Sequence, residues 1–267
     1  MISEYQTKLL QEKIRLMKQY QAEKEFYRIE GLFIKRCDVL LVFFISLIFT
    51  DLLSIFQLYS GNEHSLYNYT DFMNIVIWDS FSLVLPAMIV IFSNYLINVE
   101  HISGALKNNI TCAVPVNKLY VSKLAVLCLI NLAFAALNAL LTYLIFLFLP
   151  HKSEPVYHSL SAMIQLTGIS LGVFIAVLPI LILFIRQSSS YLNVVIAFVY
   201  GFVGVFIAGQ NLQDYYPITA FLKIVNYNNG SLTYHGNTSY ITVLIVLLFS
   251  LVAWLFMAQK LKKSDYA

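Results

Sequence analysis

The amino-acid sequence predicts an all-α integral membrane protein with six transmembrane helices. Hydrophobic residues make up 59% of the 267 residues and charged residues only 12%, which leaves too little polar surface for a soluble domain. The apolar residues also fall in runs of about 20, the length at which a helix crosses a bilayer. These runs are continuous, whereas a β-barrel would show short segments of alternating polarity, so helices are the expected way to satisfy the backbone within hydrocarbon.

Six apolar windows define the spans of a transmembrane domain at residues 32–259. We place them at about 37–58, 72–97, 121–149, 160–185, 191–209 and 240–257. An even number of spans puts both termini on one side of the membrane. Fifteen of the 17 Lys and Arg residues lie on that side, and only Lys152 and Lys223 lie on the other. The positive-inside rule therefore predicts a multi-pass protein of the cytoplasmic (plasma) membrane with both termini in the cytoplasm, the basic tail 260–267 included.

Residues 1–31 are expected to form a separate amphipathic helix. No Gly or Pro interrupts residues 2–28, and six residues form one narrow helical stripe: Ile2, Tyr5, Leu9, Leu16, Tyr20 and Tyr27. Tyrosine suits the boundary between lipid and water, which favours a helix on the cytoplasmic membrane surface or against a partner. A solvated leader helix without specific contacts is the alternative.

The cytoplasmic loop at residues 98–120 carries the most distinctive pattern. Proline disfavours helix in the preceding residue, so a short helix should end before Pro115 and a new one should start soon after it. The pattern residues are Glu100, Gly104, Lys107, Pro115 and Lys118. They resemble the corresponding loop of type-2 ABC exporter permeases, which reads E-x-x-x-G-T-x-K and then P-[VI]-x-[RK]; Ala105 stands where that pattern has Thr. The resemblance implies that this loop is the coupling helix that docks on an ATPase subunit.

The resemblance extends over most of the chain. Such permeases have six spans, an amphipathic helix before the first span and an aromatic-Pro signature in the last external segment, to which Tyr215-Tyr216-Pro217 is similar. Size and composition are most similar to the permeases of bacterial peptide-antibiotic immunity and amphipathic-peptide export. This likeness implies a peptide substrate and three kinds of partner. The partners are a P-loop ATPase subunit, a second permease copy that is identical or different, and membrane lipid.

A search for chemistry within the chain gives negative results. There is no G-x-x-x-x-G-K-[ST] phosphate loop, no H-E-x-x-H zinc motif and no G-x-S-x-G elbow. We therefore expect no catalytic residues, metal or directly bound cofactor, and we expect ATP and Mg to bind at the partner subunit. A basic cytoplasmic rim explains the formal charge of +3 without a nucleic-acid partner.

Polar residues within the spans are candidates for a substrate path, because charged groups in hydrocarbon are costly and rarely kept without a role. Asp51 and Asp79 lie toward the outer halves of their spans, where solvation at the rim is the alternative. Span amides should mostly hydrogen-bond between helices; they are Asn94, Asn131, Asn138, Gln165 and Asn193. We also assign Asn94 to the candidate path.

Small residues mark places where helices can approach closely. Gly168 and Gly172 form a GxxxG motif that suits either intrachain packing or a dimer seam. The fifth span carries a stripe of small residues, namely Ala197, Gly201, Gly204 and Ala208. In the permeases that this chain resembles, the seam involves the first and fifth spans, which implies that this stripe is the candidate dimer seam.

The external segment at residues 210–239 contains an apolar piece too short to cross the bilayer. It is expected to form a re-entrant or interfacial helix that caps the external mouth. Tyr215, Tyr216 and Pro217 would then belong to an exit gate, and a rigid lid is the alternative.

Three classes of function remain. The leading hypothesis is an ABC exporter subunit that moves an amphipathic or hydrophobic, antimicrobial or toxin-like peptide outward. A secondary transporter or channel would normally show ionisable groups near mid-bilayer or an internal repeat, and neither is clear. A membrane enzyme or sensor scaffold lacks support from any reactive cluster.

Overall fold

The structure is a computed structural model, and it describes residues 39–60, 68–103, 116–149, 156–184, 190–208, 210, 212–227 and 237–264. The amphipathic helix expected at residues 1–31 lies outside these ranges, as do residues 104–115 of the predicted coupling loop.

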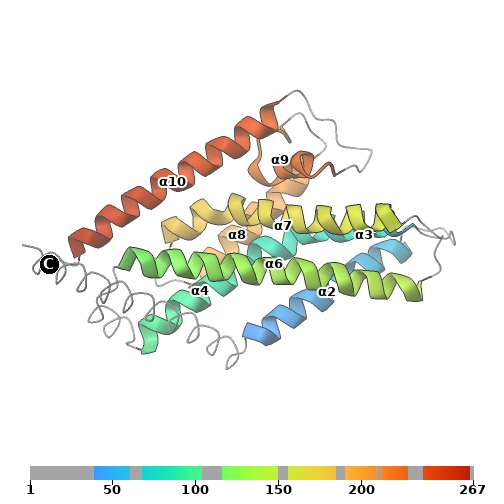
Figure 1. The fold of residues 1–267 in the computed structure, drawn as a ribbon, viewed down its shortest axis with the longest axis horizontal. Coiled ribbons are helices and arrows are strands. Elements are labelled where there is room, and N and C mark those ends of the chain that lie inside the picture. Colours follow the sequence, from blue (N-terminus) through green and yellow to red (C-terminus); the bar gives the residue numbers. More distant parts are fainter. Residues whose placement is uncertain are drawn as a thin grey trace, which may run out of the picture.

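All regular elements within the described ranges are helices, which confirms the all-α fold class (Figure 1). In chain order they are α2 (Val39–Ser60), α3 (Tyr69–Asp79), the π-helix η1 (Ser80–Val84), α4 (Leu85–Ser103), α6 (Val116–Phe148), α7 (Val156–Phe184), α8 (Ser190–Ile207), α9 (Pro217–Ile224) and α10 (Thr238–Ser264).

Five of the described helices are long and apolar enough to cross a membrane by length and composition. These stretches are Leu41–Ser60, Tyr69–Leu96, Tyr120–Phe148, Tyr157–Leu183 and Thr238–Phe256. The sixth predicted span corresponds to a shorter apolar helix, Leu192–Ile207 within α8. The 18 residues of α8 reach about 27 Å at 1.5 Å per residue, close to the thickness of a hydrocarbon core. The protein is therefore a multi-pass membrane protein of about six helices.

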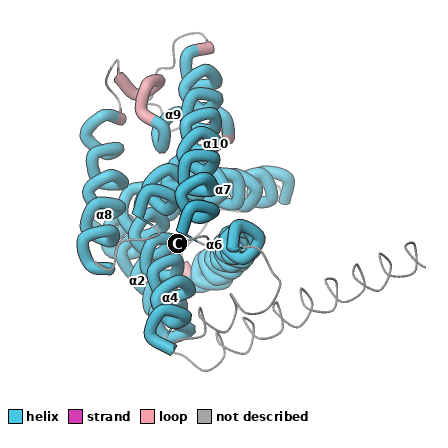
Figure 2. The backbone as a smooth tube through the Cα atoms, turned by 90° about the vertical axis from the view of Figure 1, so that its left-hand side faces the viewer, coloured by secondary structure: helices cyan, strands magenta, loops and turns pink. Residues whose placement is uncertain are grey.

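The second span is the central helix of the bundle. It consists of α3, η1 and α4 in succession, and helices α2, α6, α7 and α8 all contact it. Within the most apolar 18-residue window of the central helix, 72% of the window is buried. The corresponding share for α10, which lies along the outside of the bundle, is 28%. Figure 2 shows α8 and α6 on opposite sides of this core. Polar groups on the central helix are thus shielded from lipid by its neighbours.

A π-helical turn interrupts the central helix between Asp79 and Leu85. Pro86 lies two residues after the end of this turn and has no N–H, so the α-helical bond to the carbonyl of Ser82, four residues earlier, cannot form. That carbonyl lies against Gly201 of α8, where an added Cβ would be only 2.5 Å from it. Proline within a helix is expected to bend it, and the local result at Pro86 is a widened turn packed on a glycine.

The helices end differently from the predicted apolar windows. α4 continues to Ser103, α6 begins at Val116 and α10 reaches Ser264, whereas the windows gave about 97, 121 and 257. Hydropathy marks only the part of a helix that suits lipid, and polar residues can continue the same helix into water. The start of α6 directly after Pro115 agrees with the helix predicted to begin there.

Candidate functional site

Asp79 lies at the centre of a polar cluster buried between α2 and the central helix. Its side chain is only 2% exposed. Ser54 Oγ donates a hydrogen bond to Asp79 Oδ2 (2.9 Å), and Gln57 Nε2 donates to Oδ1 (2.8 Å). Ser54 and Gln57 are three residues apart and so share a face of α2. Both oxygens of the carboxyl group therefore have a hydrogen-bond partner, and Ser54 Oγ also lies 3.0 Å from the carbonyl oxygen of Thr50.

Asp51 occupies a second buried position, about one helical turn from Ser54. It is also 2% exposed, and Thr142 of α6 donates to its Oδ1 (2.8 Å). Asn138, one turn away on α6, donates to Ser80 Oγ (3.5 Å), next to Asp79. Hydroxyl and amide groups of α2, η1 and α6 therefore link the surroundings of the two carboxylates.

Several polar atoms in this network have no hydrogen-bond partner among the described residues. They are Asp51 Oδ2, the hydroxyl of Tyr69 and Asn138 Oδ1. Tyr69 lies in the same region, because its ring packs against Tyr143, the neighbour of Thr142, with 5.5 Å between ring centroids. Buried polar atoms are rarely left without a partner, so these three atoms mark the polar centre of the bundle as incompletely satisfied by the described residues.

The structure thus places Asp51 and Asp79 inside the bundle and not at a solvated rim. Among the described residues, no Lys or Arg forms an ion pair with either carboxylate. Both acids were predicted from the sequence as candidate path residues, but their partners Ser54, Gln57 and Thr142 were not. A signal was available, because Ser46, Thr50, Asp51, Ser54 and Gln57 form a polar stripe at helical spacing on an otherwise apolar helix.

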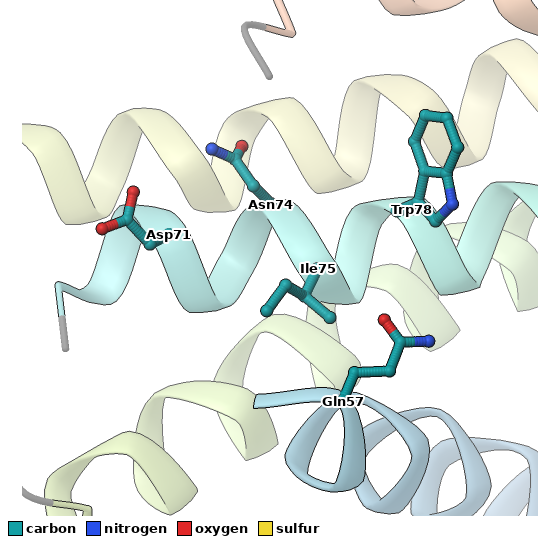
Figure 3. A pocket seen from close by; sticks show the side chains of 5 residues that line it. All are labelled: Gln57, Asp71, Asn74, Ile75 and Trp78. Carbon is teal, nitrogen blue, oxygen red and sulfur yellow. The ribbon is translucent and has the colours of Figure 1, made fainter. Parts of the chain in front are cut away.

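An open pocket of about 320 Å³ adjoins this cluster. It is lined by Gln57, Asp71, Asn74, Ile75 and Trp78. Figure 3 shows Asp71, Asn74 and Trp78 rising from one side of α3, with Ile75 and Gln57 below them. Gln57 therefore has two roles, since it forms part of the pocket wall and hydrogen-bonds to Asp79 behind it.

The segment after α9 closes against this pocket wall. Tyr227 stacks on Trp78 with 6.5 Å between ring centroids, and its hydroxyl donates to the carbonyl of Asn74 (3.0 Å). The neighbouring residue Asn226 has a left-handed backbone conformation (φ 54°), and its carbonyl accepts a hydrogen bond from Gln165 of α7 (3.1 Å). The segment predicted as an external gate is therefore in contact with the pocket.

α9 is a short buried helix, as expected for an interfacial or re-entrant element. Pro217 is its first residue, where the missing N–H costs nothing. Tyr216 precedes it and donates its hydroxyl to the carbonyl of Tyr200 in α8, while Tyr215 is 64% exposed. Burial raises the pKa of Tyr216, which keeps this hydroxyl protonated as a donor. A gate role for these residues stays a prediction.

The two glycines of the GxxxG motif serve intrachain packing in this structure. An added Cβ at Gly168 would lie 2.7 Å from Val225, and one at Gly172 would lie 2.5 Å from the ring of Phe221. The motif therefore allows α9 and the residue after it to dock closely on α7. Of the two readings left open by the sequence, intrachain packing is the one observed.

The small residues of α8 also pack within the chain. Ala197, Gly201 and Gly204 are buried, and Ala208 is half-buried. A Cβ atom added at Gly204 would lie 3.4 Å from the ring of Tyr216. The face of α8 that remains exposed is instead apolar and bulky, with Val195, Phe198, Val199, Phe202 and Phe206. A dimer interface formed by these small residues would require them to leave their contacts within the chain. The dimer seam therefore stays a prediction, and the intrachain packing of α8 does not support it.

The span amides connect helices as expected. Asn193 of α8 donates to Asn94 Oδ1 of α4 (3.4 Å), and Asn131 of α6 donates to the carbonyl of Ser170 in α7 (2.9 Å). Asn94 is therefore part of an interhelical contact, and its assignment to the substrate path remains untested.

The helices that flank the loop at 98–120 are held together at its base. Lys123 of α6 is only 4% exposed and donates to the carbonyl of Leu96 in α4 (2.7 Å). The backbone is helical at Glu100 and at Lys118, while Gly104, Lys107 and Pro115 lie outside the described residues. α4 and α6 thus form a hairpin whose arms extend beyond the apolar part of the spans into the loop.

A family model described as ABC-2 family transporter protein matches residues 28–204, which is more than half of the chain. The chain belongs to the ABC-2 transporter family. The match includes the loop at 98–120 and the helices that flank it. No curated protein and no solved structure matches the chain.

As an ABC-2 permease, the protein is the membrane subunit of an ABC transporter. Membership of this family implies an ATPase partner and a role in transport. The pattern from Glu100 to Lys118 resembles the coupling loop of type-2 ABC permeases, and the family match confirms an ABC-2 type permease.

Proposed function

We propose that this ABC-2 permease moves an amphipathic or hydrophobic peptide out of the cytoplasm or membrane, driven by ATP hydrolysis at a partner ATPase. The pattern from Glu100 to Lys118 carries the proposal, because it joins the helical arms of α4 and α6 where a coupling helix is required. The Lys123 contact fixes one arm to the other, so that movement of the loop would shift both spans. ATP and Mg would bind at the partner subunit.

The bundle is suited to an amphipathic substrate. Its outer faces are strongly apolar, while a polar cluster and an open pocket lie beside the central helix. An amphipathic substrate could place its apolar part against the outer faces and its polar part in the pocket. We further propose that the loop at 98–120 faces the cytoplasm and that the α9 segment faces outward, as the distribution of Lys and Arg favours. The permease would act with a second copy, identical or different.

Transport by inside-out membrane vesicles tests this function. Vesicles that contain the permease and its ATPase are expected to take up a fluorescent amphipathic helical peptide when ATP is added. Vesicles without the permease, or with a non-hydrolysable ATP analogue, are the controls.

The same assay separates the exporter from a secondary transporter. Uptake by an exporter should continue after ionophores have collapsed the ion gradients, because ATP supplies the work. Uptake that stops with ionophores and ignores ATP would contradict the proposal and support the alternative.

A further inference from the structure

We infer that the pocket between α2 and α3, with Asp79 behind it, binds an ammonium group carried on an apolar chain. In the context of the proposed function, on which this identification rests, the group is a cationic side chain or amino terminus of the exported peptide. Two independent observations support this assignment: an accessible pocket and a buried carboxylate that has no counter-charge among the described residues.

The first step concerns charge. Asp79 and Asp51 are both 2% exposed and have only neutral hydrogen-bond donors among the described residues. Charge within a membrane-spanning bundle is costly unless another charge compensates it. Ser54 and Gln57 contact both oxygens of Asp79 but carry no charge, so a bound cation would supply the counter-charge that they do not.

The second step concerns access. Gln57 is the link between the pocket and Asp79, because it lines the first and hydrogen-bonds to the second. Asp79 itself does not line the pocket, so Gln57 would have to rotate away for a ligand in the pocket to reach the carboxylate. Asp71 adds a second negative charge at the pocket, where Asn68 donates to its Oδ2 (3.1 Å). The approach to Asp79 is therefore itself attractive to cations.

The third step concerns the shape and lining. A volume of about 320 Å³ is at the lower end of the usual range for small-ligand pockets, about 300–1,000 Å³. It suits a side-chain-sized group better than a whole peptide. Trp78 and Ile75 offer apolar surface for methylene groups, and an indole face also attracts ammonium ions. A ligand that shifts Trp78 would also shift Tyr227, which stacks on it, and through Tyr227 the segment after α9.

A single tryptophan can report on binding in this pocket. The chain has two tryptophans, Trp78 and Trp254, so Trp254→Phe leaves Trp78 as the only indole. This variant, purified in an uncharged maltoside detergent, would be titrated with decylammonium, decanol and decyl sulfate. The ratio of the dissociation constants for decanol and decylammonium measures the preference for positive charge. Because micelle partitioning is the same for every protein variant, comparing variants isolates the contribution of the pocket.

We expect decylammonium to change the emission of Trp78 at lower concentrations than decanol, and decyl sulfate to be the weakest. Asp79→Asn preserves the shape of the side chain but removes its charge, and it should reduce the preference for decylammonium by about tenfold or more. An unchanged preference in Asp79→Asn would overturn the assignment.

A second variant keeps the test valid if Asp79→Asn fails to fold. Asn74→Asp adds a negative charge to the pocket wall with almost no change in size, and the side chain of Asn74 makes no hydrogen bond to the described residues. The preference for decylammonium should then rise several-fold; no rise would reject the site. If the Trp254→Phe protein with Asp79 intact shows no preference for decylammonium over decanol, while ATP-driven peptide transport is intact, the pocket assignment is removed and the proposed function stands.

Discussion

Gly201→Ala is expected to destabilise the permease by about 2 kcal/mol, whereas Gly204→Ala on the same face of α8 should be neutral or slightly stabilising. A methyl group at position 201 would lie 2.5 Å from the carbonyl of Ser82 and 2.8 Å from the ring of Pro86. Neither group is a flexible side chain, so helix α8 itself must move. Overpacking of this kind typically costs about 1–3 kcal/mol, more than the gain of up to about 1 kcal/mol in helix propensity.

Gly204 provides the matched control, because its added methyl would lie 3.4 Å from Tyr216, an ordinary contact distance. The two variants change the same residue type in the same helix by the same group. Thermal unfolding in detergent, followed by the loss of monodisperse protein, would measure the difference. Equal stability of the two variants would show that α8 does not pack closely on the π-helical turn in solution.

Gly104→Leu is expected to reduce ATP-driven transport by at least about tenfold while leaving membrane insertion intact. Insertion depends on the apolar spans, which this change does not touch. Coupling depends on the loop at 98–120, where a bulky side chain should disturb docking on the ATPase. Glu100→Ala should act in the same direction, because it alters the same proposed docking surface. Transport and ATP turnover by the reconstituted complex would be compared.

Gly61→Leu is a suitable control for the loop variant. It makes the same change in the predicted external loop, away from the ATPase. Transport is expected to stay near the wild-type rate in this variant. A similar loss in both variants would indicate a general effect on folding and would contradict a specific role for the loop at 98–120.

The spans could be predicted from sequence because bilayer thickness fixes the length of an apolar run. Helix ends such as Ser103 and Val116 could not, since polar residues continue a helix without a hydropathy signal. The π-helical turn was missed because Pro86 predicts a kink but not the widened turn before it. The Pro86–Gly201 contact depends on tertiary packing of distant segments, which no local pattern contains.

The candidate site, too, could be predicted from the sequence only in part. Asp51 and Asp79 stood out because charge in a span is rare, but their partners lie on other helices and required the fold. The small residues of α7 and α8 were correctly recognised as places of close approach. Their neighbours were not predictable, since a glycine can admit a second chain as well as the ring of Phe221. The pocket beside Trp78 has no sequence signature.

The most direct test of a permease driven by a separate motor is to purify the tagged full chain in mild detergent and assay the complex for ATP turnover. The account predicts that a P-loop ATPase subunit copurifies and that turnover responds to Glu100→Ala in the permease. A chain that purifies without any such ATPase, and whose peptide transport is unaffected by ATP depletion, would contradict it.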